Sequence, residues 1–253
     1  MKRMSFAIVV ALVMVFASLT VGNAAVLDKE TILVGTESTY PPYEFRGSDN
    51  SLQGFDIELT EALAEIMGKK VEWVDMPFDS LIPALLSGKI DLIAAGLSAT
   101  EERARKVAFS EAYEISLSTF IVKAGREDIK SMEDLKGKVV AAQLGTVQDS
   151  FATAIEGVGE VKRFQKFDDC VREVALERAD ATLMDRPVAV KFVAQKDFAD
   201  KVSLAFDQEI TGAAKALATR LDEETFLKAL DDALATLKAD GRLEALKNKW
   251  MKY

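Results

Sequence analysis

Arg103 is the residue whose type and position point most directly to chemistry. It follows an apolar run, IDLIAAG, and a small polar turn, SAT, and it is the first long cation of the charged segment that comes next. A guanidinium beside a Ser hydroxyl and backbone N–H groups can hold a planar carboxylate through two hydrogen bonds. We therefore predict a site for a small anion, with Ser98 as a second donor, with Gly96 leaving room for close backbone approach, and with Ala95 as a further ligand-binding residue. The alternative, a solvated helix charge, is what we expect for Arg105.

The composition excludes several other kinds of chemistry. The 253 residues contain no histidine and a single cysteine, Cys170, which we interpret as a small core residue. Serine and cysteine nucleophiles usually need a histidine base, and zinc sites usually draw on histidine or several cysteines. We therefore expect no metal and no cofactor, while carboxylate or lysine catalysis stays possible. The formal net charge of −9 disfavours a nucleic-acid partner, because phosphate binding requires a concentrated basic face.

The first residues have the pattern of a secretory signal. Lys2 and Arg3 supply a positive start, an uncharged run covers residues 6–21, and the small residues GNA end at Ala24. We predict cleavage after Ala24, which would remove residues 1–24 and release a periplasmic protein. A retained membrane anchor is less favoured, because the run is shorter than the roughly 20 residues that span a bilayer. No cysteine follows the run to carry a lipid.

Strands and helices alternate along the rest of the chain, which favours an α/β fold with parallel sheets. The expected strands are residues 31–35, 71–74, 90–95, 138–142 and 181–185, and the first long helix covers 55–67. Apolar stripes with helical spacing fill the C-terminal part, at Phe226, Leu230, Ala233 and Leu237 and again from Leu243. The pattern restarts after a change of texture near residues 113–119, so two lobes are expected, with ligand at the carboxyl ends of the strands.

Four segments together resemble the periplasmic amino-acid-binding proteins that serve ABC importers. They are TESTYPPYEF (36–45), FDSLIPALLSGKIDLIAAGLSATEER (78–103), AAQLGTVQD (141–149) and ADATLMDRP (179–187). The resemblance covers essentially the whole expected mature chain in order, including the closing KADGRLEALKNKW. It implies the type II periplasmic binding protein fold, in which two α/β lobes joined by two hinge crossings close on the ligand.

The resemblance also implies where the lobes divide. Lobe 1 would take residues 25–112 together with 214–253, and lobe 2 would take residues 119–208. The hinges would be residues 113–118 and 209–213.

By the same resemblance, Arg103 and Ser98 would bind the ligand carboxylate, and Asp185 would bind the α-ammonium from the opposite lobe. The competing interpretation of Asp185 is a helix cap before Pro187. We favour ligand binding, because an acid there complements Arg103 across the cleft.

Thr146 and Val147 stand at an expected helix start, where free N–H groups and the helix dipole favour an anion. The resemblance implies that their backbone donors reach the carboxylate from lobe 2. Many relatives carry another small or polar residue where this chain has Val147, so we expect no side-chain contact there.

Tyr40 and Phe78 match two aromatic walls around the ligand side chain, and Glu37 and Gln143 remain to select the ligand. A carboxylate at position 37 would repel glutamate or aspartate, so arginine or lysine fits best and glutamine comes next. Two interpretations of Glu37 stay open, a ligand contact and an exposed charge at the end of a strand.

The sequence therefore predicts a monomeric binding protein without enzymatic activity. It would capture a free L-amino acid by hinge closure and deliver it to an ABC transporter permease. The alternative is a secreted cyclohexadienyl or prephenate dehydratase on the same fold, with Glu37 as general acid. Arg103 and Asp185 argue against that enzyme, because prephenate has no α-ammonium. A receptor sensor lobe is less favoured, since no membrane segment or signalling domain follows Tyr253.

Overall fold

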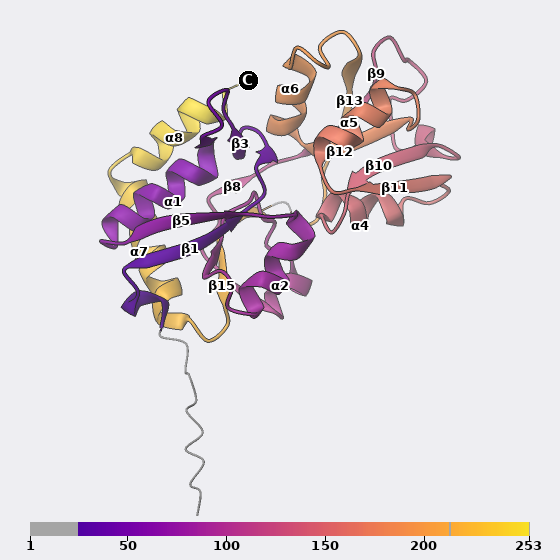
Figure 1. Cartoon of the computed structure of the whole chain (residues 1–253). Helices are drawn as coiled ribbons and strands as arrows, with labels where there is room; N and C mark the ends of the chain where they lie inside the picture. The colour runs from indigo at the N-terminus through magenta and orange to yellow at the C-terminus, as the bar shows by residue number, and fades with distance from the viewer. Residues whose placement is uncertain (1–24, 213, 253) are drawn as a thin grey trace, which may run out of the picture.

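Two five-stranded sheets, each covered by helices, form two lobes that lie side by side in the computed structural model (Figure 1). The structure describes residues 25–212 and 214–252. The predicted signal peptide and its cleavage after Ala24 lie outside the described residues. We call the half built on the sheet that contains β1 lobe 1 and the other half lobe 2.

The sheet of lobe 1 has the strand order β5-β1-β6-β15-β7. Its strands are β1 (Thr31–Thr36), β5 (Lys70–Asp75), β6 (Leu92–Ile93), β7 (Val107–Phe109) and β15 (Ala218–Arg220). β1 runs parallel to β5 and β6, whereas β15 is antiparallel to β6 and β7. The C-terminal part of the chain thus returns to complete the sheet that the N-terminal part began.

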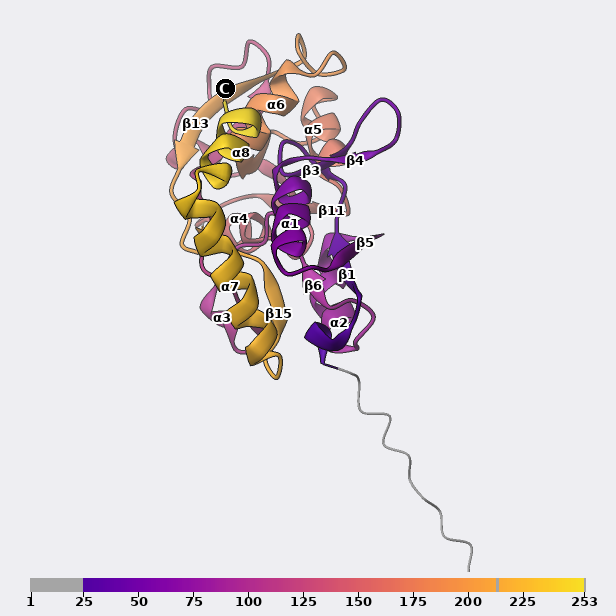
Figure 2. The same cartoon turned by 90° about the vertical axis from the view of Figure 1, so that its left-hand side faces the viewer.

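Helices on both sides bury the apolar faces of this sheet. They are α1 (Phe55–Ile66), α2 (Leu81–Leu86) and α7 (Glu224–Ala239), and α8 (Arg242–Trp250) packs on α1 and α7. α7 and α8 lie against α1 in Figure 2, and the predicted stripe from Phe226 to Leu237 is buried on α7. Among the helices of the described residues, none combines the length and the apolarity needed to cross a bilayer.

Gly54 fixes the start of α1. Its φ of 134° is accessible to glycine, and an added Cβ would lie 2.1 Å from the carbonyl oxygen of Tyr43. Phe55, Leu59 and Leu63 then bury one face of the helix in the core. The helix matches the span predicted from residues 55–67 to within one residue at its C-terminal end.

The sheet of lobe 2 has the order β11-β10-β12-β9-β13. Its strands are β9 (Ser118–Lys123), β10 (Val139–Gln143), β11 (Glu160–Phe164), β12 (Ala181–Asp185) and β13 (Val202–Gln208). The covering helices are α4 (Val147–Ala154), α5 (Phe167–Ala175) and α6 (Arg186–Ala194). β10 is parallel to β11 and β12, and β9 is antiparallel to β12 and β13. Cys170 is fully buried on α5 as a free thiol, which confirms its interpretation as a core residue.

A two-stranded ribbon connects the lobes (Figure 1). It pairs β8 (Glu114–Ile115) with β14 (Ala214–Lys215) in antiparallel register, so that Lys215 stands opposite Glu114. β8 lies within the first predicted hinge, and β14 begins directly after the second. The exact bounds of lobes and hinges stay predictions.

The remaining elements are short. They are the three-stranded sheet of β2 (Thr39–Tyr40), β3 (Glu44–Arg46) and β4 (Leu52–Gln53), the helix α3 (Glu101–Ala104), and 3-10 turns at Val26–Asp28, Phe78–Ser80 and Glu133–Leu135.

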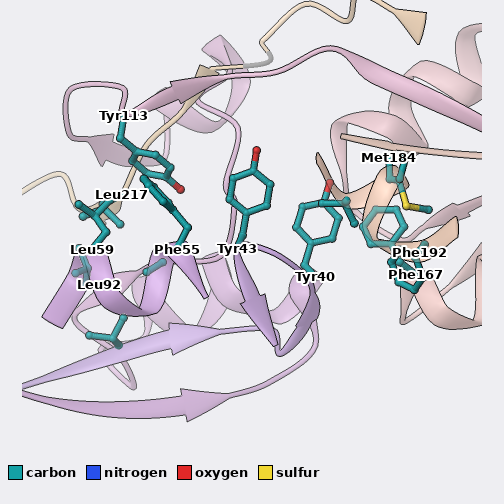
Figure 3. Packing of buried hydrophobic residues seen from close by; sticks show 14 of the residues in the cluster. Tyr40, Tyr43, Phe55, Leu59, Leu92, Tyr113, Phe167, Met184, Phe192 and Leu217 are labelled. Atoms are coloured by element: carbon teal, nitrogen blue, oxygen red, sulfur yellow. The ribbon is translucent and has the colours of Figure 1, made fainter. Parts of the chain in front are cut away.

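A row of aromatic rings runs from the core of lobe 1 to that of lobe 2 (Figure 3). The ring of Tyr40 is stacked on Tyr43 with centroids 5.6 Å apart, and on Phe167 of lobe 2 with centroids 4.8 Å apart. Phe55 and Tyr113 continue the row within lobe 1, with ring centroids 5.5 Å apart. Tyr40 therefore belongs to a packed interface between the two lobes.

Candidate ligand-binding site

All eleven residues that the sequence analysis named as ligand contacts line one cavity between the lobes. They are Glu37, Tyr40, Phe78, Ala95, Gly96, Ser98, Arg103, Gln143, Thr146, Val147 and Asp185. Most of them follow the carboxyl ends of β1, β6, β10 and β12, where open α/β sheets place ligands. The empty space among these side chains comes to about 290 Å³, part of it open to solvent.

Four further residues line the cavity and were missed, namely Glu44, Gln148, Phe167 and Lys215. Gln148 follows Val147 on the first turn of α4, so the predicted helix start could have indicated it. Phe167 is the first residue of α5 and follows the strand β11. That strand was not predicted from the sequence. Glu44 lies within the segment TESTYPPYEF, in which only Glu37 and Tyr40 were named as ligand contacts. Lys215 belongs to a short β element without a motif, and no sequence signal identified it.

Arg103 reaches across the cavity mouth from α3. The hydroxyl of Thr100, at the N-cap of α3, accepts from the Arg103 backbone N–H at 3.2 Å and fixes the start of the helix. The Arg103 Nη1 donates to the Ser98 carbonyl oxygen at 2.8 Å, and the Arg103 Nη2 donates to the Gly145 carbonyl oxygen of lobe 2 at 3.0 Å. The guanidinium also lies over the Phe78 ring, 5.5 Å from the centroid. Arg103 is thus held at the site, unlike the exposed Arg105.

The guanidinium of Arg103 has no carboxylate partner among the described residues. Burial lowers the pKa of Arg103 to about 10, so the group stays charged at neutral pH. A partly desolvated cation that is bound only to neutral oxygens gains more from an incoming anion than a solvated cation does.

Asp185 ends β12 and occupies the N-cap position of α6, but its side chain makes no capping hydrogen bond. Its Oδ2 accepts from the Tyr40 hydroxyl at 2.6 Å, and its Oδ1 accepts from Gln148 Nε2 at 3.3 Å. The same Oδ2 lies 2.6 Å from Lys215 Nζ. The side chain is directed into the cavity, so its interpretation as a mere helix cap is wrong.

Lys215 is the unexpected cation of the site. It is 1 % exposed and stands on β14 of the connecting ribbon. Its Nζ donates to the Ser98 hydroxyl at 2.9 Å, in addition to the ion pair with Asp185. Lysines are rarely this buried unless they are paired, and here a single ammonium links the two lobes.

Thr146 caps α4 as the sequence predicted. Its Oγ1 accepts from the Asp149 N–H at 3.0 Å and donates to the Gln143 carbonyl oxygen at 2.8 Å. Because the hydroxyl is committed to these bonds, the backbone N–H groups of the first turn remain as its means of binding an anion.

Glu37 is buried, so the interpretation as an exposed strand-end charge is wrong. Its carboxylate accepts from the Thr39 hydroxyl at 2.7 Å and from Gln143 Nε2 at 3.2 Å. Gln143 Nε2 also donates to the Gln165 carbonyl oxygen at 2.9 Å, which fixes its amide. Burial raises the pKa of Glu37 to about 7, despite the hydrogen bonds that lower it.

Other buried acids lie in or near the site. Glu44 is 1 % exposed, its Oε2 has no hydrogen-bond partner, and burial raises its pKa well above the usual range. Asp56 accepts from the Gly96 N–H and the Tyr113 hydroxyl, both at 2.7 Å, and burial raises its pKa to about 7. Glu114 accepts from the Tyr43 hydroxyl, and burial also raises its pKa. These carboxyl groups favour a cation, because a positive charge would restore their ionised forms.

The two predicted aromatic walls hold different partners. Tyr40 stacks on Phe167 and donates to Asp185, whereas Phe78 lies beneath the Arg103 guanidinium. Gly96 lies against the Tyr40 ring, and a Cβ there would be 3.2 Å from two ring carbons. The small residue keeps the ring close to the strand end.

Comparison with known proteins identifies the family. The model of the bacterial extracellular solute-binding proteins, family 3, matches residues 32–253. The chain belongs to this family. The resemblance found from the sequence motifs is confirmed, and so is the two-lobed type II periplasmic binding protein fold.

Relatives at similar distances carry different ligand names. The chain is 35% identical over 228 residues to the L-cystine-binding protein TcyJ of Escherichia coli (strain K12), covering 89% of this chain and 84% of TcyJ. It is 35% identical over 224 residues to the arginine-binding extracellular protein ArtP of Bacillus subtilis (strain 168), covering 88% and 86%. The solved structure of an ancestral arginine-binding protein bound to arginine is 38% identical, with a TM-score of 0.84 and coverage of 88% of this chain and 99% of that one.

Proposed function

We propose that this protein captures a free L-amino acid with a basic or polar side chain in the periplasm and delivers it to the permease of an ABC transporter. Arginine or lysine is the preferred ligand class, and glutamine comes next. The protein acts as a monomeric binding protein after removal of its signal peptide. The observation that carries the proposal is the placement of Arg103 and Asp185, from opposite lobes, around one cavity.

The preference for a basic side chain rests on two further carboxyl groups that line the cavity. Glu37 and Glu44 are both buried, and no lysine or arginine among the described residues forms an ion pair with either of them. A guanidinium or ammonium at the tip of a ligand would neutralise Glu37. It could also donate a hydrogen bond to the side-chain oxygen of Gln143. Glutamate or aspartate would place like charges together.

A binding panel tests the proposal directly. The protein is unfolded, refolded to remove bound ligand, and heated with each of the twenty amino acids. A ligand at 100 times its dissociation constant stabilises a folded protein by about 2.7 kcal/mol, a clear shift of the unfolding midpoint. We expect shifts with arginine or lysine first and glutamine second. A panel in which none of these three ligands shifts the midpoint contradicts the proposal.

The variant Glu37→Gln tests which group selects the ligand. Its matched control is Glu102→Gln, because Glu102 is an exposed acid on α3. The neutral amide at position 37 should weaken basic ligands relative to glutamine, and the control should leave the order unchanged. An unchanged order in Glu37→Gln would show that another group selects the ligand.

A dehydratase finds less support on this site. Its candidate acid, Glu37, is hydrogen-bonded to Thr39 and Gln143. The relatives described above are named as binding proteins. Incubation with prephenate and arogenate should therefore give no turnover, and measurable turnover would revive the alternative.

A further inference from the structure

The ammonium of Lys215 lies where the two lobes meet inside the cavity. Ser98 links the two cations of the site, because its carbonyl oxygen accepts from Arg103 Nη1 and its hydroxyl accepts from Lys215 Nζ. Lys215 Nζ in turn lies 2.6 Å from Asp185 Oδ2. A continuous path of polar contacts therefore leads from Arg103 through Ser98 and Lys215 to Asp185.

An α-amino acid bound between Arg103 and Asp185 would need the middle of this path. With its carboxylate at Arg103, its α-ammonium would come to Asp185, which is the position that Lys215 Nζ holds. Two ammonium groups cannot share one carboxylate oxygen in a buried cavity without strong repulsion. The lysine and the ligand amine are therefore competitors.

We propose that the Lys215 ammonium occupies the α-ammonium subsite of the ligand-free protein, so that Lys215 determines how much a ligand gains from its own amino group. The inference rests on the proposed function and deepens it. The favoured ligand class is a carboxylate with a cationic or amide tail, and the α-amino group contributes little to its affinity.

Glu44 offers the displaced lysine a second partner. It lines the same cavity, it is 1 % exposed, and its Oε2 has no hydrogen-bond partner. Burial raises the pKa of Glu44, and the charge of Lys215 acts in the opposite direction, so the two groups influence each other. When a ligand amine takes Asp185, Lys215 moves toward Glu44. A glutamine or methionine side chain at this position carries no charge, so it could not move from Asp185 to Glu44 in this way.

Matched ligand pairs isolate the contribution of the amino group. The pairs are L-arginine with 5-guanidinopentanoate, L-lysine with 6-aminohexanoate, and L-glutamine with glutaramate, and the second member of each lacks only the α-ammonium. Dissociation constants are measured by calorimetry for the wild type, Lys215→Met and the control Lys228→Met. Lys228 is an exposed residue of α7 that pairs only with Asp232 among the described residues.

In the wild type, we expect loss of the α-ammonium to weaken binding less than about tenfold, because Lys215 already satisfies Asp185. In Lys215→Met the same loss should weaken binding about 100-fold, the range of a charge-assisted hydrogen bond in a buried site. Lys228→Met should match the wild type. Equal ratios in the wild type and Lys215→Met refute the inference and leave the proposed function intact.

The wild type alone also gives a decisive result. If Lys215→Met does not fold, a wild-type preference of about tenfold or more for the amino acid over its partner overturns the inference. A preference below tenfold supports it. Should none of the six compounds bind to any variant, the proposed function fails, and this inference fails with it.

Discussion

The two ends of the site differ in what already occupies them. Arg103 donates only to the carbonyl oxygens of Ser98 and Gly145, whereas Asp185 receives three side-chain donors, from Tyr40, Gln148 and Lys215. Arg103 can therefore still pair with an anion, whereas most of the hydrogen-bonding and charge-pairing capacity of Asp185 is already used by groups of the protein. Two oppositely charged residues that look equivalent in sequence should contribute unequally, Arg103 to binding and Asp185 to stability.

Asp185→Asn should have the largest effect, and on stability. It leaves the buried Lys215 ammonium without its counter-charge, and breaking a buried pair in this way costs about 3–5 kcal/mol. Urea denaturation of the ligand-free protein measures the change. The control is Asp207→Asn, because Asp207 pairs with Arg186 at the half-exposed surface of the same lobe, where about 0–1 kcal/mol is expected. The Thr119 hydroxyl, which also donates to Asp207, can donate to the amide oxygen of the variant. Equal losses in the two variants would remove the distinction between the two ends of the site.

Arg103→Ala should weaken amino-acid binding about 100-fold, because it removes a charge-assisted contact to the ligand carboxylate. Its effect on the free energy of unfolding should be small, since only neutral carbonyl oxygens lose a partner. Calorimetry and urea denaturation measure both quantities, with Arg105→Ala as the exposed neighbour. If Arg103→Ala and Arg105→Ala bind the ligand equally well, the anion site lies elsewhere.

The stability of the ligand-free protein should fall as the pH rises from about 4.5 to above 7. Burial raises the pKa values of Glu37 and Asp56 to about 7, above those of the unfolded chain. The folded protein therefore holds protons that the unfolded chain has lost, and the resulting stability is present at low pH and disappears through pH 7. Each group contributes up to about 1.4 kcal/mol per pH unit. Glu37→Gln should flatten the profile, and a profile of unchanged slope would contradict the assignment to Glu37.

Thr146→Ala should have the smallest effect, a loss of about 1 kcal/mol in the free energy of unfolding, because it removes the N-cap of α4. Amino-acid affinity should stay within about threefold, since the backbone N–H groups remain. A much larger loss of affinity would assign the hydroxyl itself to the ligand.

The same contrast explains which residues of the site could be predicted from the sequence. Arg103, Asp185 and Thr146 could be predicted because each follows a strand whose carboxyl end must face the cavity, in a segment with a recognisable motif. Lys215 stands in the run AAKALATR, which has no such motif, and a lysine there has the composition of a surface residue. Its burial is created by the pairing of β14 with β8, two segments about a hundred residues apart, so only the folded structure reveals it.

Glu44 was missed for a related reason. In the run YEFRG it resembles an ordinary strand charge, and nothing in that run indicates that it is only 1 % exposed in the folded protein. Side-chain contacts that form where two lobes meet leave no periodic pattern in either segment. The helix α1 and the strands β10 and β12, in contrast, can be predicted from the local pattern of apolar residues.

The stacked rings of Tyr40 and Phe167 add a property that does not depend on which ligand enters. Separating the two lobes would expose the faces of the Tyr40 and Phe167 rings that meet, whereas Tyr40 would keep its contact with Tyr43 of its own lobe. An aromatic side chain buries about 150–250 Å². In the proposed binding cycle, that hydrophobic contact would resist opening in the same way for arginine, lysine or glutamine, so it would set a common threshold for entry and release. The polar groups around the cavity would then select the solute. The rate of entry and release and the ligand selectivity would therefore depend on different residues.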